Sequence, residues 1–150
     1  MIARLQIFGQ VASSCVDILG RHDDTALENG VMMGLYEMPR FEMPHQGETP
    51  PALITEIANL GSAVEMYAAN ENRVRRLAED RTRNGAPRGS STFREGLRTV
   101  LSVWSDEVAK LSVQILRRIA IIYPDLAEDA GDALGNVSWP TRGDEQTANS

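Results

Sequence analysis

The stretch TFREGLRTVLSVWSDEVAKLSVQILRRIAIIY, residues 92–123, predicts one long α-helix that decides the fold. Thr92 and Glu95 form a T-x-x-E capping box at its start, and Pro124 prevents its continuation. At roughly 1.5 Å per residue the helix is about 46 Å long, so it must run the length of the molecule or kink. Its apolar residues recur three and four positions apart and form one stripe: Leu97, Leu101, Trp104, Val108, Leu111, Ile115, Ile119 and Ile122.

A second long helix is predicted directly before this one. Thr49 followed by Pro50 and Pro51 is typical of a helix start, and the helix should run to about Arg83. Its stripe contains Leu53, Ile57, Leu60, Val64, Tyr67 and Val74, and is broken by Glu71. The two helices are joined only by the short segment NGAPRGSS, which favours an antiparallel hairpin.

Three shorter helices are predicted around the hairpin. The first covers residues 2–19 and stops at Gly20, with a stripe of Leu5, Phe8, Ala12, Cys15 and Leu19. A weaker helical segment opens at a second capping box, Thr25 with Glu28, and must end before Pro39. Its glycines, Gly30 and Gly34, predict close approach of another backbone. A last helix starts at Pro124 and ends near Gly135.

These elements predict an all-α fold, a helical bundle built on a long antiparallel helix hairpin with an N-terminal helix and two short helices. Residues 1–139 are expected to form a single domain. Residues 140–150 contain no apolar anchor and are expected to be a disordered acidic tail.

Composition narrows the class of protein. The net charge is −6, and no apolar run is long enough to cross a membrane. Cys15 is the only cysteine, which excludes an internal disulfide and fits a reducing compartment. We therefore expect a cytoplasmic protein that does not bind membranes.

Catalytic signals are missing from the sequence. Its two histidines, His22 and His45, lie in predicted turns without a second histidine or a cysteine at metal-ligand spacing. No nucleophile elbow, phosphate-binding loop or zinc-protease motif occurs. No catalytic residue and no cofactor are expected from the residues alone.

One resemblance points the other way. The stretch LITEIANLGSAVEMY, residues 53–67, resembles the metal-binding helix of the MazG-like all-α nucleotide pyrophosphohydrolases, and DEVAKLSVQILRRIAI looks like that family's second metal helix. The resemblance implies a Mg²⁺-dependent hydrolase of nucleoside triphosphates, with Glu56 and Glu107 as metal ligands. The family motif places a second acid three residues after each, where this sequence has Asn59 and Lys110.

Basic residues crowd the predicted tip of the hairpin. They are candidates for contact with phosphate or with an acidic partner: Arg73, Arg75, Arg76, Arg81, Arg83 and Arg88. No aromatic residue lies between Arg73 and Arg88 to stack on bases, so nucleic acid is the less favoured ligand. The alternative is a solvated tip with local ion pairs such as Arg75 with Glu79.

Apolar residues beyond the main stripes predict an interface with another protein or with a second copy. Methionines cluster early in the chain, and the long helix carries apolar residues on a second side. The candidates are Met32, Met33, Val103, Val113 and Leu116.

The leading functional hypothesis is a small non-enzymatic interaction protein: a regulator, inhibitor or assembly factor of bacterial or phage type. It rests on the missing catalytic motifs, the uneven charge and the apolar surface of the helices. The pyrophosphohydrolase and a nucleic-acid-binding protein that uses the Arg-rich tip remain the alternatives.

Overall fold

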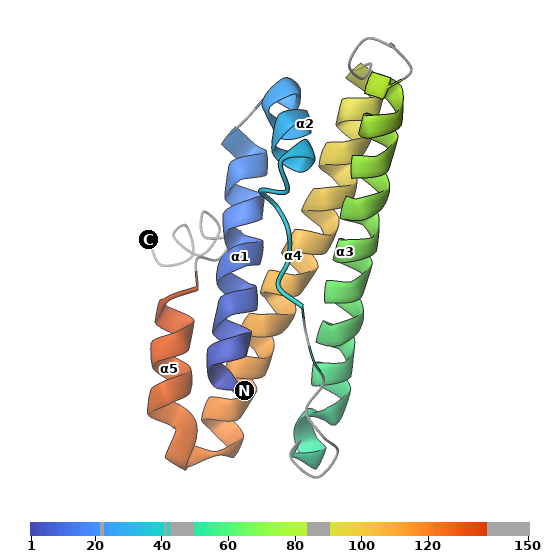
Figure 1. Cartoon of the computed structure of the whole chain (residues 1–150). Helices are drawn as coiled ribbons and strands as arrows, with labels where there is room; N and C mark the ends of the chain where they lie inside the picture. Colours follow the sequence, from blue (N-terminus) through green and yellow to red (C-terminus); the bar gives the residue numbers. More distant parts are fainter. Residues whose placement is uncertain (22, 41, 43–49, 84–90, 138–150) are drawn as a thin grey trace.

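The computed structural model describes residues 1–21, 23–40, 42, 50–83 and 91–137 (Figure 1). The described part is an all-α bundle, as predicted. Its helices are α1 (Ile2–Arg21), α2 (Asp24–Met32), α3 (Ile54–Arg83), α4 (Ser91–Ile122) and α5 (Ala127–Gly135), with 3₁₀ turns at Pro51–Leu53 and Pro124–Leu126. Both histidines, Thr49, Arg88 and the predicted acidic tail lie outside the described residues.

Helix α4 is the centre of the bundle, because it contacts α1, α2, α3 and α5. It pairs with α3 as the predicted antiparallel hairpin. Near the end of α4, Arg118 Nε lies 2.9 Å from Glu56 Oε1 at the start of α3. At the opposite end, Leu77 late in α3 and Gly96 early in α4 line the same groove.

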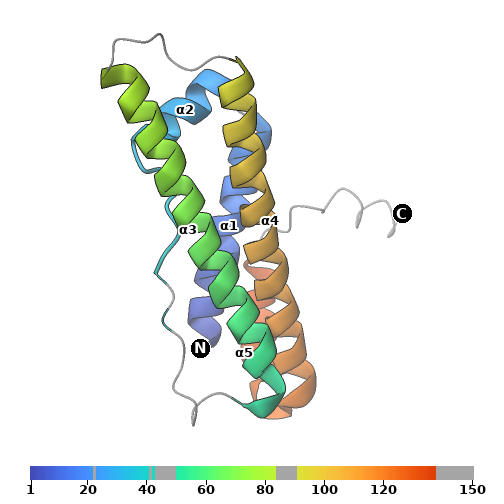
Figure 2. The ribbon, with the colours of Figure 1, turned by 90° about the vertical axis from the view of Figure 1, so that its right-hand side faces the viewer.

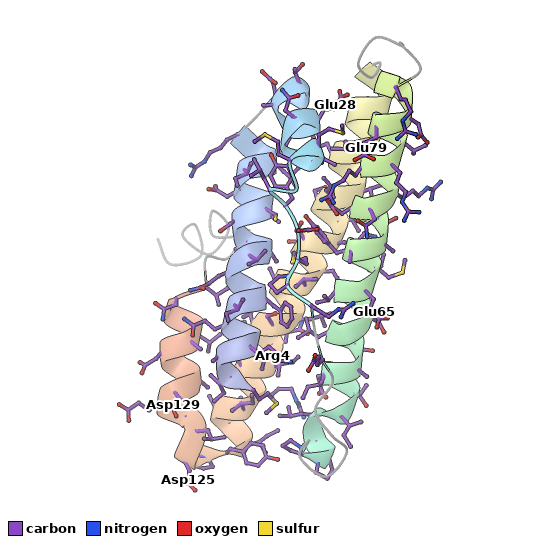
Figure 3. The ribbon with its side chains drawn as sticks, in the orientation of Figure 1. Arg4, Glu28, Glu65, Glu79, Asp125 and Asp129 are labelled. Carbon is purple, nitrogen blue, oxygen red and sulfur yellow. The ribbon has the colours of Figure 1, made fainter. Side chains whose placement is uncertain are left out.

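Helix α1 runs antiparallel to α4, and α5 folds back beside both (Figure 1). A Cβ added at Gly9 would lie 3.1 Å from the methyl groups of Val137 and 3.5 Å from Ser112 Cβ, so Gly9 permits a close approach. Gln10 Nε2 also donates a hydrogen bond of 3.3 Å to the carbonyl oxygen of Asn136. Figure 3 shows Asp129 pointing away from the other helices, on the exposed side of α5.

The core forms two apolar clusters along α4. The lower cluster lies at the end of the bundle that is lowest in Figure 1, and it joins α1, α3, α4 and α5. It includes Leu5, Phe8, Ile57, Leu60, Ile115, Leu116, Ile119 and Ala130. The upper cluster adds α2 and includes Cys15, Leu19, Leu27, Val31, Tyr36, Tyr67, Leu97 and Leu101. Most residues of the predicted stripes are buried, so the helical periods identified the core correctly.

Helix α2 differs from its prediction in its N-cap, and it ends before Pro39 as predicted. The N-cap is Asp23, whose carboxylate accepts a 2.8 Å hydrogen bond from the backbone N–H of Ala26, and not Thr25. At the other end, Gly34 has a φ of +71°, and its N–H and that of Leu35 bond back to the carbonyls of Val31 and Gly30. This Schellman arrangement ends the helix at Met32, well before Pro39.

None of the described helices is both long enough and apolar enough to cross a membrane.

Candidate functional site

One face of the hairpin is left uncovered by the other described helices. Figure 2 shows α3 and α4 side by side in front, with α1, α2 and α5 behind them. The helical spacing places one set of residues along this face, which we call the hairpin outer face: Met66, Asn70, Arg73 and Leu77 on α3, with Gly96, Val100 and Val103 on α4.

The hairpin outer face carries exposed apolar side chains. Met66 and Leu77 are each 45% exposed and Val103 is 55% exposed. Single exposed apolar residues are common on protein surfaces, but these three share one face. They therefore form an apolar surface that the chain itself leaves open.

A groove of about 290 Å³ crosses the upper half of this face. Val74 and Leu97 are buried at the junction of the two helices. The residues that line the groove come from both helices and are mostly apolar: Asn70, Arg73, Val74, Leu77, Gly96, Leu97 and Val100. A groove of this size accommodates a few side chains, and lies below the usual range for drug-sized ligands.

Gly96 is the unusual residue of the groove. Glycine in a helix interior costs about 1 kcal/mol relative to alanine. A Cβ added at Gly96 would meet no atom of the described residues within 4 Å, whereas one added at Gly30 would collide with the ring of Tyr36. The packing of the chain explains Gly30 but gives no reason for Gly96.

The tip arginines fall into distinct settings. Arg73 lines the groove, and both Arg73 and Arg76 are exposed. Arg83 is also exposed and lies 3.4 Å from Asp80. The side chain of Arg81 and the whole of Arg88 lie outside the part of the chain that the structure describes. Only Arg73 and Arg76 thus combine exposure with a position at or beside the groove.

Arg75 is half-buried and contacts other segments of the chain. It forms an ion pair with Glu71 one turn earlier, and its Nε donates a 3.1 Å hydrogen bond to the carbonyl oxygen of Val31 at the end of α2. Its Nη1 lies 3.6 Å from Glu37 Oε1. The side chain of Arg75 is 21% exposed, so this guanidinium holds α2 and the following segment against α3.

Glu71 lies at the edge of a second, wider groove. Its side chain is only 2% exposed, and burial raises the pKa of this carboxyl although Arg75 lowers it in part. The groove is about 530 Å³ and lies between α3 and residues 37–40. Because Glu71 is already paired with Arg75, the described residues that line this groove present no buried carboxylate in need of a ligand.

Buried polar contacts of Tyr67 link α3 to Cys15 on α1 and to the segment after α2. The hydroxyl of Tyr67 donates a hydrogen bond to the carbonyl oxygen of Tyr36, and Cys15 Sγ lies 3.7 Å from the same hydroxyl. Burial raises the pKa of the Cys15 thiol and of the Tyr67 phenol. Both groups therefore stay protonated at neutral pH, and the thiol is not activated as a nucleophile.

The predicted interface residues separate into surface and core. Met33 is 74% exposed, Val103 is 55% exposed and Met32 is half-buried. Val113 and Leu116 are 6% and 0% exposed. This corrects the expectation of a surface position for these two residues, because other helices of the chain cover that side of α4.

The two candidate metal ligands occupy different settings. Glu56 pairs with Arg118, whose Nη2 also donates a 3.4 Å hydrogen bond to the carbonyl of Ala52. Glu107 is half-buried on α4. Within the part of the chain that the structure describes, no three histidine, cysteine or acidic residues come together as a metal-binding group.

A scan against protein-family models found no match, and searches of the curated proteins and of the solved structures found none either.

Of the residues on the hairpin outer face, the sequence alone predicted Arg73 and Val103 as contact residues, and it did not indicate Leu77, Gly96 or Val100. Leu77 is an isolated apolar residue within an Arg-rich run, and Gly96 is a glycine in a predicted helix. Either could have been noticed. That they share one groove depends on the relative position of α3 and α4, which no local pattern specifies.

Proposed function

We propose that the protein acts by binding another protein through the hairpin outer face, as a small regulator, inhibitor or assembly factor. The observation that carries this proposal is the open apolar groove between α3 and α4, with Gly96 in its wall. Two parallel or antiparallel helices with an apolar groove between them are a common receptor for a partner helix.

Exposure supports the same face. Met66, Leu77 and Val103 remain accessible after the chain has buried its main apolar stripes. Their transfer from water into an interface is favourable by about 25 cal/mol per Å² of apolar surface. A partner that covers all three would gain this contribution without any change in the core.

A cytoplasmic location belongs to the proposal. Cys15 is the only cysteine and is buried as a free thiol. This use of cysteine is typical of proteins in a reducing compartment.

The test is site-specific photo-crosslinking in the native cells. A photoreactive amino acid replaces Val103 on the hairpin outer face, and the matched control replaces Ile7, which is 49% exposed on α1. We expect one defined protein adduct from position 103, absent from position 7 and abolished by Leu77→Arg in the same chain. No adduct at position 103, or the same adducts at both positions, would overturn the proposal.

A further inference from the structure

The chemistry of the groove specifies the kind of partner. We infer that the hairpin outer face binds an amphipathic helix whose apolar side enters the groove and whose flank beside α3 carries carboxylates. This inference rests on the proposed function and names the partner class.

Shape favours a helix as the occupant. The groove follows the junction of two antiparallel helices, where a third helix packs its side-chain ridge between theirs. Gly96 lowers the wall on the α4 side, because no Cβ projects there and no atom of the described chain fills the space. A partner backbone can therefore approach α4 more closely at Gly96 than at any alanine or larger residue.

Apolar character sets the inner side of the partner helix. Most of the described residues that line the groove are apolar, namely Val74, Leu77, Leu97 and Val100, and Asn70 is the one neutral polar residue among them. Apolar anchors spaced three and four residues apart match such a groove. A strongly polar helix would lose hydration there without replacement.

The charge beside the groove on α3 indicates the side chains expected on the flank of the partner helix. Among the residues that the structure describes, Arg73 is the only charged one that lines the groove, and Arg76 is exposed one turn away on the same helix. Neither guanidinium appears in the ion pairs of the described residues, whereas Arg75 and Arg83 do. Carboxylates on a docked helix would pair with Arg73 and Arg76, and arginine suits this fork-like pairing.

The attraction between the two arginines and the carboxylates of the partner must act at short range. The chain as a whole carries a net charge of −6, so its overall field does not draw in an acidic partner. Glu107 is half-buried further along α4, away from the tip. The carboxylates of the partner are therefore expected at the level of Arg73 and Arg76 only.

The experiment uses the whole chain and two designed amphipathic peptides as probes. The peptides share their leucine positions and differ only in one flank, which carries glutamates in one peptide and lysines in the other. Binding is measured by fluorescence anisotropy. We expect the glutamate peptide to bind at least tenfold more tightly, and the double variant Arg73→Glu, Arg76→Glu to reverse the preference.

A variant of the groove separates docking from charge. Gly96→Gln places a side chain in the groove at a position where the helix tolerates it, and circular dichroism checks that the variant is folded. We expect it to weaken both peptides at least tenfold. The exposed-surface control Gly131→Gln, on α5, should leave both affinities unchanged.

The remaining outcomes overturn the inference in distinguishable ways. Equal affinity for both peptides would show that the partner needs no acidic flank, although the groove still binds a helix. If neither peptide binds, the partner is not an amphipathic helix, while an adduct at position 103 would still support the proposed function. A dimer in sedimentation equilibrium that Val103→Arg dissociates identifies a second copy as the occupant, and displacement of the peptide by single-stranded RNA identifies nucleic acid.

Discussion

The ring of Tyr36 packs directly against Gly30. A Cβ added at Gly30 would lie 2.5 Å from the Tyr36 hydroxyl oxygen and 2.6 Å from its Cε2, closer than side-chain atoms can approach. Tyr36 is 4% exposed and belongs to the upper core cluster. Gly30 therefore leaves the space that the Tyr36 ring occupies, and the packing of this ring holds the segment after α2 in place.

Gly30→Ala is expected to destabilise the protein. The better helix propensity of alanine contributes about 1 kcal/mol, but overpacking against Tyr36 costs about 1–3 kcal/mol. We expect a net loss of roughly 1 kcal/mol in the free energy of unfolding, measured by urea denaturation. Gly96→Ala is the matched control, since its Cβ meets no atom of the described residues, and it should gain up to about 1 kcal/mol. Equal effects at the two positions would contradict this account.

Tyr67→Phe removes the hydrogen bond between α3 and the segment after α2. The carbonyl of Tyr36 would then remain buried with only the weak Cys15 thiol nearby, at 3.9 Å. An unsatisfied buried acceptor costs about 1–3 kcal/mol, so urea denaturation should show a loss in this range. Tyr36→Phe keeps the same carbonyl acceptor and should cost less. A larger loss for Tyr36→Phe would show that this bond is not the main contribution.

Glu71 makes stability depend on pH. Burial raises the pKa of this carboxyl above its ordinary value of 4.5, so the folded protein binds the proton more tightly than the unfolded chain does. The stability that this tighter proton binding contributes is fully present below the pKa of Glu71 in the unfolded chain. It is lost as pH rises through the pKa of Glu71 in the folded protein. Glu71→Gln should therefore gain stability relative to the original protein between pH 4.5 and pH 7.

The measurement is the free energy of unfolding of both proteins across this range. Glutamine does not titrate, so the pH dependence that the variant loses is that of the Glu71 carboxyl and its pairing with Arg75. Glu65→Gln, at an exposed position of the same helix, is the matched control for the substitution itself. A constant difference between Glu71→Gln and the original protein would refute the assignment.

Arg75→Ala should be strongly destabilising. It leaves the Glu71 carboxylate buried without its cation and removes the hydrogen bond to Val31. Loss of one member of a buried pair costs about 3–5 kcal/mol, and the partial exposure of Arg75 places the expected value at about 3 kcal/mol or less. Arg73→Ala, at the exposed neighbour, should change thermal stability very little. Comparable losses in the two variants would contradict the structural role of Arg75.

Ser112→Ala is expected to stabilise the protein. Ser112 is fully buried on α4, and its hydroxyl has no hydrogen-bond partner among the described residues. Removing an unsatisfied buried hydroxyl should gain about 1 kcal/mol. Ser105→Ala is the control, because the Ser105 hydroxyl donates a 2.8 Å hydrogen bond to the carbonyl of Leu101. A thermal melt that shows a loss for Ser112→Ala would indicate a hydrogen bond that this hydroxyl makes in solution.

Local signals in the sequence determined the helices. The predicted long helix, residues 92–123, is observed as Ser91–Ile122, and the second long helix ends at Arg83 as predicted. Periodicity and a terminating proline act within a few residues, so they can be recognised without the rest of the fold. The same patterns predicted the all-α class and the buried stripes.

Tertiary structure decided which side of each helix is covered. The apolar side of α4 that contains Val113 and Leu116 suggested a subunit interface, but helices of the same chain bury it. Glu71, which interrupts a predicted stripe, is itself buried, and its ion pair with Arg75 offsets part of the cost of burying a carboxylate. A helical period shows where a side chain points around its own axis, and only long-range packing specifies its neighbour. For the same reason, the groove that joins Leu77 and Gly96 exists only once α3 and α4 lie side by side.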